Sequence, residues 1–310
     1  MTDLTAQAVK ACESWGGSLT PPRLIANREN AVFEVTLIGG IKAALRLHRP
    51  GYQSSSDIWA ELHWTNALAA KGFPCPRPIM TEFQGMVVSD ARGAVSSVVS
   101  WIDAAPIGKG GEPFNGPLQD QLALMERLGA TIRRLHRLTD ELNIGRLQRP
   151  SWDAEALLGE NPHWGRFWEN PSLSSGEAAL LRKARAKAAQ QLSTIKGLDT
   201  GLIHADLLQE NILQNADGLH IIDFDDAGYG YRLYDLGTAL VQHAEHPDRD
   251  QLAAALCRGY GCDAQLMPLF ILLRTLASCG WVIPRLPRND PGHRVYANRA
   301  LRCATDFLSA

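Results

Sequence analysis

The chain changes its pattern after about its first hundred residues, and this change limits the folds open to it more than any other feature. Residues 1–102 combine runs rich in β-branched residues with one clear helical segment, whereas most of the remainder shows apolar residues at helical spacing. Between them, residues 103–117 are rich in glycine and proline, which breaks regular structure. The sequence therefore predicts an α+β protein with a small antiparallel-sheet lobe (1–102), a connection (103–117) and a larger, mainly helical lobe (118–310).

Two hairpins and one helix are predicted in the small lobe. The candidate strands are Ala31–Leu37, Ile41–His48, Gly85–Asp90 and Ala94–Trp101. Gly39-Gly40 separates the first two runs and Arg92-Gly93 the last two, which is typical turn chemistry. A helix is expected from about Asp57 to Ala70, because serines at 54–56 offer N-cap hydroxyls and Gly72 follows its end.

The large lobe is predicted to hold long helices around one short strand pair. The candidate helices are Leu118–Leu138, Ser174–Ile195, Leu233–Glu245, Asp248–Gly259, Ala264–Trp281 and His293–Leu308. Leu202-Ile203 indicates a buried strand or the entrance to a turn. A hairpin begins at Ile212-Leu213, turns at residues 215–218 and returns as a strand to Phe224.

Polar residues lie between the apolar runs of this strand pair. Asp206 and Asn211 precede the hairpin and Asp223 follows its second strand, so the hairpin is expected to bring all three to one mouth. Phosphoryl transfer needs a carboxylate for the acceptor hydroxyl and oxygen ligands for magnesium. Asp206 suits the base, and Asn211 and Asp223 suit the metal. Alone, such a residue is more often a turn former or cap; together they favour phosphoryl transfer.

These residues carry a family resemblance. His204-x-Asp206-x-x-x-x-Asn211, followed by Ile222-Asp223-Phe224-Asp225, resembles the paired motifs of the aminoglycoside phosphotransferase and choline kinase family, relatives of the protein kinases. The resemblance extends over nearly the whole chain. It implies a bilobal protein-kinase-like fold, ATP bound between the lobes, a requirement for Mg²⁺, Asp206 as the catalytic base, and Asn211 and Asp223 as metal ligands.

The resemblance also implies supporting residues. His204 would support the catalytic loop, and Asp225, or as a second choice Asp226, would contact a metal or its ligands. Asp235, in Tyr234-Asp235-Leu236-Gly237, resembles the family's aspartate that anchors the catalytic loop backbone. The alternative for Asp235, a carboxylate that interacts with a helix dipole, is equally open.

The nucleotide side rests on a predicted strand and the helix after it. Arg46 occupies the family's position for a basic residue that reaches the α and β phosphates, and Glu61 matches the carboxylate that pairs with it. A guanidinium can bind phosphate in a bidentate way. Lys42 shares the strand face and is the alternative, as is a solvent-facing role for Arg46. Ser100 and Ile102 match the linker whose backbone would bind adenine.

The phosphate-covering turn has no glycine-rich motif. Residues 27–33, Asn-Arg-Glu-Asn-Ala-Val-Phe, occupy its place, and neither G-x-G-x-x-G nor a Walker lysine motif is present. This argues against protein-kinase-style and P-loop nucleotide sites. In the family that the chain resembles, this turn is often polar.

The acceptor is the least constrained feature. Trp164, Phe167 and Trp168 either cage a cation or fill the helical core, and the second is favoured. The motifs resemble the branch that holds homoserine kinase type II-like enzymes and the bacterial stress response kinase A. We therefore expect an ATP- and Mg²⁺-dependent transfer of the γ-phosphate to a hydroxyl of a small metabolite such as an amino alcohol. The alternatives are a Ser/Thr protein kinase with a protein substrate, an aminoglycoside-resistance phosphotransferase and a non-catalytic nucleotide-binding module.

Composition excludes several other classes. The formal net charge of −2 provides no field for nucleic acid or an anionic membrane, and no run looks long and uncharged enough to span a bilayer. The N-terminus has no basic segment followed by an apolar core, so a cytoplasmic protein is expected. The six cysteines show no metal-site spacing and are expected to be reduced. Oligomeric state stays open.

Overall fold

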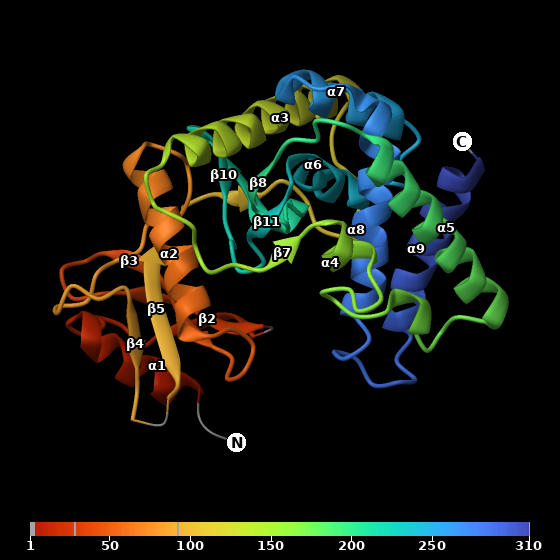
Figure 1. The fold of residues 1–310 in the computed structure, drawn as a ribbon. Helices are drawn as coiled ribbons and strands as arrows, with labels where there is room; N and C mark the ends of the chain where they lie inside the picture. The colour runs from red at the N-terminus through yellow and green to blue at the C-terminus, as the bar shows by residue number, and fades with distance from the viewer. Residues whose placement is uncertain (1–3, 28, 92, 310) are drawn as a thin grey trace. The chain divides into compact units, whose positions relative to one another are not determined.

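In the computed structural model, which describes residues 4–27, 29–91 and 93–309, the chain divides into two compact units (Figure 1). Unit 1 contains Met1–Ala105, Glu141–Arg149 and Gln214–Asp225. Unit 2 contains Pro106–Asp140, Pro150–Leu213 and Asp226–Ala310. Unit 1 is therefore built from three separate segments of the chain. The lobe limits at residues 102 and 118 stay a prediction.

Unit 1 is built on a five-stranded sheet with the order β1-β2-β3-β5-β4. Its strands are β1 (Arg23–Asn27), β2 (Asn30–Thr36), β3 (Lys42–His48), β4 (Val87–Ser89) and β5 (Val95–Ser100). Every neighbouring pair is antiparallel, and both predicted hairpins, β2–β3 and β4–β5, are confirmed. Gly39 and Gly40 have φ of 102° and 80°, which glycine adopts without steric cost.

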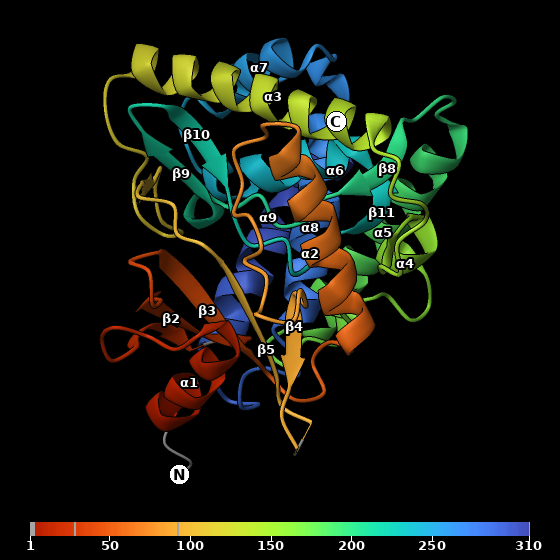
Figure 2. The same ribbon diagram turned by 90° about the vertical axis from the view of Figure 1, so that its left-hand side faces the viewer.

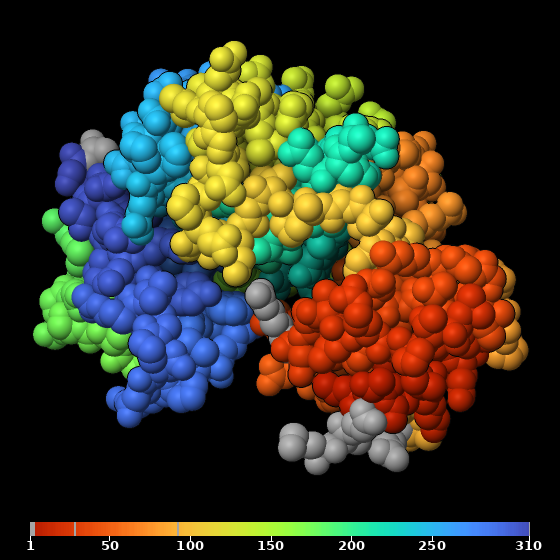
Figure 3. Space-filling view, turned by 180° about the vertical axis from the view of Figure 1, so that it is seen from behind, coloured from red at the N-terminus to blue at the C-terminus, as the bar shows by residue number. Residues whose placement is uncertain are grey.

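Two helices cover the two faces of this sheet (Figure 2). Helix α1 (Leu4–Cys12) packs with Phe33, Leu45 and Val98, which point to one face because strand side chains alternate. Helix α2 (Ser55–Ala70) packs Ile58 and Leu62 on the other face. Figure 3 shows the outer surface of the N-terminal part of unit 1 in red and orange.

Helix α2 begins where the serine cluster predicts. The Ser54 hydroxyl accepts a hydrogen bond from the amide of Asp57, and the Asp57 carboxylate accepts one from the amide of Ser54. This capping box satisfies amides that the first helical turn leaves without partners. It fixes the start of the helix that carries Glu61.

Unit 2 is mainly helical. Its helices are α3 (Leu118–Glu141), α4 (Ala154–Leu158), α5 (Ser175–Thr194), α6 (Arg232–Leu240), α7 (Arg249–Tyr260), α8 (Met267–Trp281) and α9 (Gly292–Ser309). In Figure 1, α8 and α9 lie side by side with α5. The last residue of α3, Glu141, belongs to unit 1. The fold class, a mixed fold with an antiparallel sheet and a larger helical part, is confirmed.

The remaining strands form two small three-stranded sheets. Strands β7 (Ser151–Trp152), β11 (Gly228–Tyr231) and β8 (Thr200–Ile203) form one sheet, in which β11 pairs antiparallel with β8. Strands β10 (Gly218–Ile221), β9 (Ile212–Asn215) and β6 (Ala105–Pro106) form another. The strand predicted to reach Phe224 ends at Ile221, and Asp223 has φ of 66°, which no strand residue adopts.

Two further expectations need correction. Ala264–Trp281, which includes α8, is an 18-residue stretch of mean hydropathy 1.2, long and apolar enough for a membrane span, and it is the one such helix in the described part of the chain. Of this stretch 67% is buried in the protein, so its place in the core of unit 2 accounts for its composition. The helix predicted at 233–245 ends at Leu240 and continues as a 3₁₀ turn, Val241–His243.

Candidate active site

In unit 2, Asp206 follows strand β8 and shares its carboxylate between two partners. Oδ1 lies 2.6 Å from Nη2 of Arg274, and Oδ2 accepts a hydrogen bond of 2.9 Å from Nδ2 of Asn211. The same Nδ2 donates to the backbone carbonyl of Asp206 at 2.9 Å. The Asp206 side chain is 19% exposed, so the carboxylate is oriented and still reachable.

The electrostatics of Asp206 balance burial against charge. Burial raises the pKa of Asp206 above its usual value, while Arg274, His204 and Asn211 act to lower it. Arg274 itself is nearly buried and stacks its guanidinium over the ring of Trp164, 4.7 Å from the centroid. A partly buried carboxylate whose pKa is raised by burial is suited to accept a proton from a hydroxyl group, and the fixed cation beside it holds it in one orientation.

Asp235 on α6 binds the backbone of the two residues that precede Asp206. Its Oδ1 accepts a hydrogen bond of 2.7 Å from the amide of Ala205, and its Oδ2 one of 3.0 Å from the amide of His204. Nδ1 of His204 accepts from the amide of Asp206 at 3.2 Å. Of the two possibilities for Asp235, the geometry is that of an anchor for the loop, and His204 supports the same loop.

In unit 1, Arg46 forms a buried cluster with two carboxylates. Its Nη1 lies 2.7 Å from Oε1 of Glu61 and 3.1 Å from Oδ1 of Asp225. Asn30 donates to the other oxygen of Asp225. Lys42, the alternative to Arg46, is exposed, 3.6 Å from Glu34 and above the ring of Trp101. The strand therefore places Arg46, and not Lys42, beside Glu61.

The two carboxylates of this cluster differ in acidity. Burial raises the pKa of Glu61 to about 7, although Arg46 acts to lower it. For Asp225, burial is outweighed by Arg46 and by a hydrogen bond from Glu61, so its pKa lies below the usual value. Both carboxyl groups contact the Arg46 guanidinium, and Asp225, with the lower pKa, is the more readily ionised of the two.

Asp223 belongs to unit 1, two residues before Asp225. Its charge helps to raise the pKa of Arg46, which places it near that guanidinium. Arg149 donates to the carbonyls of Phe224 and Asp225, which fixes the backbone that follows Asp223. Asn211 and Asp223 thus lie in different units, and the described residues contain no cluster of three or more His, Cys, Asp or Glu side chains that could hold a metal.

The predicted adenine-binding segment follows β5. The amide of Ser100 donates to the carbonyl of Arg77 at 2.8 Å, so this amide is already used, and the Ser100 hydroxyl accepts from the amide of Arg77. The carbonyl of Ile102 accepts from the amide of Ala104 at 3.1 Å. In the phosphate-covering segment 27–33, Arg28 lies outside the described residues, whereas Asn30 reaches Asp225.

Of the aromatic residues before α5, two lie in the core and one contacts the candidate site. Phe167 and Trp168 are buried, as the preferred interpretation holds, and Arg185 lies over the ring of Trp168. Trp164 instead lies against Arg274, the partner of Asp206. The alternative for Asp225, Asp226, lies in unit 2, where its charge acts on Arg274.

Sequence reasoning did not predict Arg274 or Arg149 as members of these clusters, and it placed Asn30 in the phosphate-covering segment without its contact to Asp225. Arg274, Asn30 and Arg149 are far in sequence from the residues that they contact, by 68 positions for Arg274 and Asp206 and by 195 for Asn30 and Asp225. One signal was present for Arg274, a lone charge inside the apolar run of α8. Such a residue in a buried helix needs a partner.

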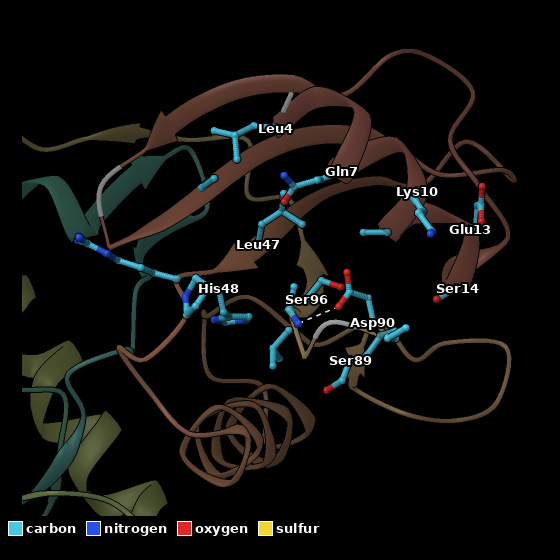
Figure 4. A pocket seen from close by; sticks show the side chains of 18 of the residues that line it. Leu4, Gln7, Lys10, Glu13, Ser14, Leu47, His48, Ser89, Asp90 and Ser96 are labelled. Atoms are coloured by element: carbon cyan, nitrogen blue, oxygen red, sulfur yellow. Dashed lines mark hydrogen bonds between the residues drawn. The ribbon is translucent and has the colours of Figure 1, made fainter. Parts of the chain in front are cut away.

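Unit 1 also contains a cavity of about 730 Å³ between α1 and the β4–β5 hairpin (Figure 4). Its floor includes Ala31, Leu47, Ser96 and Val88, which pair in one row across four strands. Arg46 belongs to the neighbouring row and therefore points to the opposite face of the sheet. The cavity is thus separate from the Arg46 cluster.

Residues 22–270 match the model of the phosphotransferase enzyme family. This match covers most of the chain. The chain belongs to that family. Among curated relatives of this family member is a homoserine kinase from Methylobacillus glycogenes, 25% identical over 182 residues, which are 58% of this chain and 51% of that protein. The chain thus spans about half the length of that relative.

Other relatives match over more of their length. An amicoumacin kinase from Bacillus subtilis is 22% identical over 287 residues, 85% of this chain and 78% of that protein. A microcompartment-associated aminopropanol kinase has a similar structure, with a TM-score of 0.83 and 27% identity over 99% of this chain and 98% of the other. A choline kinase from Streptococcus pneumoniae, at 12% identity and a TM-score of 0.68, shares the fold.

Proposed function

We propose that this family member is an ATP-dependent kinase that transfers the γ-phosphate to a hydroxyl group of a small metabolite. The observation that carries the proposal is the Asp206 carboxylate, oriented by Arg274 and Asn211 on a loop anchored by Asp235. Family membership, and relatives named as homoserine, aminopropanol and amicoumacin kinases, support the same chemistry.

In this proposal, Asp206 orients the acceptor hydroxyl and takes its proton as the phosphoryl group is transferred. Arg274 keeps the carboxylate ionised and fixes its rotamer, so that an oxygen faces the hydroxyl. Arg46 binds phosphate oxygens of ATP, while Glu61 and Asp225 hold the guanidinium in place. Ser100 and Ile102 belong to the segment that we propose contacts adenine.

We propose Mg²⁺ as the cation, held by Asn211 and Asp223. Nδ2 of Asn211 donates both hydrogen bonds of this side chain, so Oδ1 is the atom suited to a cation. An amide oxygen and a carboxylate are hard ligands of the kind that Mg²⁺ prefers. When bound, the ion neutralises charge on the phosphates of ATP.

The acceptor class that we propose is a small amino alcohol or hydroxy amino acid. Relatives named for homoserine and aminopropanol act on compounds in which an amine accompanies the hydroxyl group. The Asp206 and Asp226 carboxylates near Arg274 leave the local charge negative, which suits an ammonium group. The aromatic face of Trp164 is covered by Arg274 and is a poorer site for a cation.

The test is ATP turnover with a panel of acceptors, namely homoserine, 1-amino-2-propanol, ethanolamine, choline and spectinomycin, beside a generic protein substrate. We expect product with at least one amino alcohol or hydroxy amino acid, its loss in D206N, and its loss when EDTA removes divalent cations. Phosphorylation of the protein substrate alone would instead establish a protein kinase. Absence of turnover with intact ATP binding would establish a nucleotide-binding module and overturn the proposal.

A further inference from the structure

A hydrogen-bonded network in unit 2 extends from the C-terminal end of α7 to the loop that carries Asp206. Oη of Tyr260 lies 2.9 Å from Nδ1 of His136, and Nε2 of His136 lies 3.0 Å from Oδ2 of Asp235. Asp235 in turn binds the amides of His204 and Ala205. This Tyr260–His136–Asp235 network therefore ends one residue before Asp206. Its three members come from α7, α3 and α6.

The network has a definite direction of hydrogen bonding. Burial alone would raise the pKa of Asp235, but hydrogen bonds from His136 and His204 keep it below the usual value, so the carboxylate is ionised and only accepts. Nε2 of His136 must then donate. When the ring is neutral, Nδ1 accepts the hydrogen bond that the phenol of Tyr260 donates. A phenol that donates to Nδ1 favours the neutral tautomer in which Nε2 carries the proton that Asp235 accepts.

Close helix packing fixes Tyr260 against His136. A methyl group at Gly129 of α3 would lie 2.0 Å from the carbonyl oxygen of Leu256, and one at Gly259 of α7 would lie 1.9 Å from that of Glu126. The two backbones therefore approach at glycines on both helices. The rings of His136 and Tyr260 meet edge to face with centroids 5.6 Å apart. Backbone packing, rather than a flexible side chain, sets this contact.

The loop that the network reaches needs an external support. Ala205 has φ of 66°, a left-handed conformation that is unfavourable for a residue with a Cβ. Its amide is bound to Asp235 at 2.7 Å, and the adjacent amide of His204 is bound to the same carboxylate. Small shifts of Asp235 would therefore move the backbone that directs the Asp206 side chain.

The geometry points to His136 and Tyr260 as positioning residues that act on Asp206 through Asp235. This role rests on the proposed function of Asp206, but the hold of the network on the loop is independent of any substrate. Neither residue reaches the reacting groups, so each is expected to change kcat and to leave the KM for ATP nearly unaltered. Metal ligands and bases in other enzymes depend in the same way on hydrogen-bonding groups behind them.

The experiment compares Tyr260→Phe, His136→Leu and His136→Gln with the wild-type protein. Y260F removes only the hydroxyl group, H136L removes both hydrogen bonds, and H136Q keeps a donor for Asp235. Tyr52→Phe, on the segment between β3 and α2 of unit 1, is the matched control. Amide hydrogen exchange of peptides that cover residues 202–208 reports on the loop without any substrate. Steady-state ATP turnover with homoserine or 1-amino-2-propanol supplies kcat and KM.

We expect exchange in 202–208 to rise by about fivefold or more in Y260F and further in H136L, because each loses a hydrogen bond that supports Asp235. For H136L, kcat should fall about 10- to 100-fold, with partial rescue in H136Q. Unchanged exchange in both Y260F and H136L would overturn the proposed role. So would equal losses in H136Q and H136L. If exchange rises but no acceptor is turned over, the positioning role stands and the proposed function fails.

Discussion

The pKa of Glu61 makes the stability of unit 1 depend on pH in a direction that can be calculated. Glu61 is 2% exposed, and burial raises its pKa from 4.5 to about 7 even beside Arg46. A carboxyl group whose pKa is higher in the folded state binds its proton more tightly there. The folded state is therefore favoured by this group below about pH 4.5, and the advantage is lost as the pH rises through about 7.

The magnitude follows from the shift. Each pKa unit corresponds to about 1.4 kcal/mol, so between pH 5 and pH 8 this group should reduce the free energy of unfolding by about 2 to 3 kcal/mol. Glu61→Gln replaces the carboxyl group with a neutral one of the same shape and removes the titration. Relative to wild type, E61Q should thus gain stability as the pH rises.

Urea unfolding followed by tryptophan fluorescence, to which Trp64 on the same helix contributes, measures the effect at pH 5, 6, 7 and 8. Glu34→Gln is the control, because Glu34 pairs with Arg23 and Lys42 and its side chain is 22% exposed. We expect the difference between E61Q and wild type to grow over this range and that for E34Q to stay nearly constant. Parallel pH profiles for wild type and E61Q would refute the reasoning, as would a growing advantage of wild type at high pH.

Three further predictions concern unit 2. Asp206→Asn should lower kcat by about 10²- to 10⁴-fold with little change in the KM for ATP, as steady-state kinetics would show, and unchanged turnover would exclude its role as base. Arg274→Met should lower kcat by about 10- to 100-fold, since a hydrogen bond to a charged group is lost, whereas Arg302→Met on the surface should not. Gly259→Ala should destabilise by about 1 to 3 kcal/mol, because its Cβ would meet a carbonyl 1.9 Å away, and Gly176→Ala, with open space around it, should not; thermal melts distinguish the two.

Local signals in the sequence predict much of the fold. The β2–β3 hairpin follows from β-rich runs around Gly39-Gly40, and α2 from the serine cap and the glycine after its end. These signals succeed because turns and caps depend on neighbouring residues. Helix α1 and strand β1 were missed, since short amphipathic elements before a turn carry no comparable marker.

Partners of the candidate site residues were predictable only where they lie on adjacent elements. Arg46 and Glu61, on β3 and α2, are 15 residues apart, and their pairing could be expected from the order of the elements. Arg274 lies 68 positions from Asp206, and His136 lies 99 positions from Asp235. The local sequence around Arg274 and His136 does not predict these partners. Burial of a charged or polar side chain shows that a partner exists, but tertiary packing decides which one.

The conformation of the two predicted catalytic segments explains why local reasoning stops short of the site. Three described residues other than glycine have positive φ, and two of them are Ala205, directly before Asp206, and Asp223. Alanine has no intrinsic preference for positive φ, so the sequence around Ala205 does not predict this conformation. The conformation persists because hydrogen bonds from distant elements outweigh its cost, as Asp235 does for Ala205. Catalytic geometry of this kind is a property of the folded unit. Substitutions well outside the motif should therefore be able to lower activity while they leave the free energy of unfolding nearly unchanged.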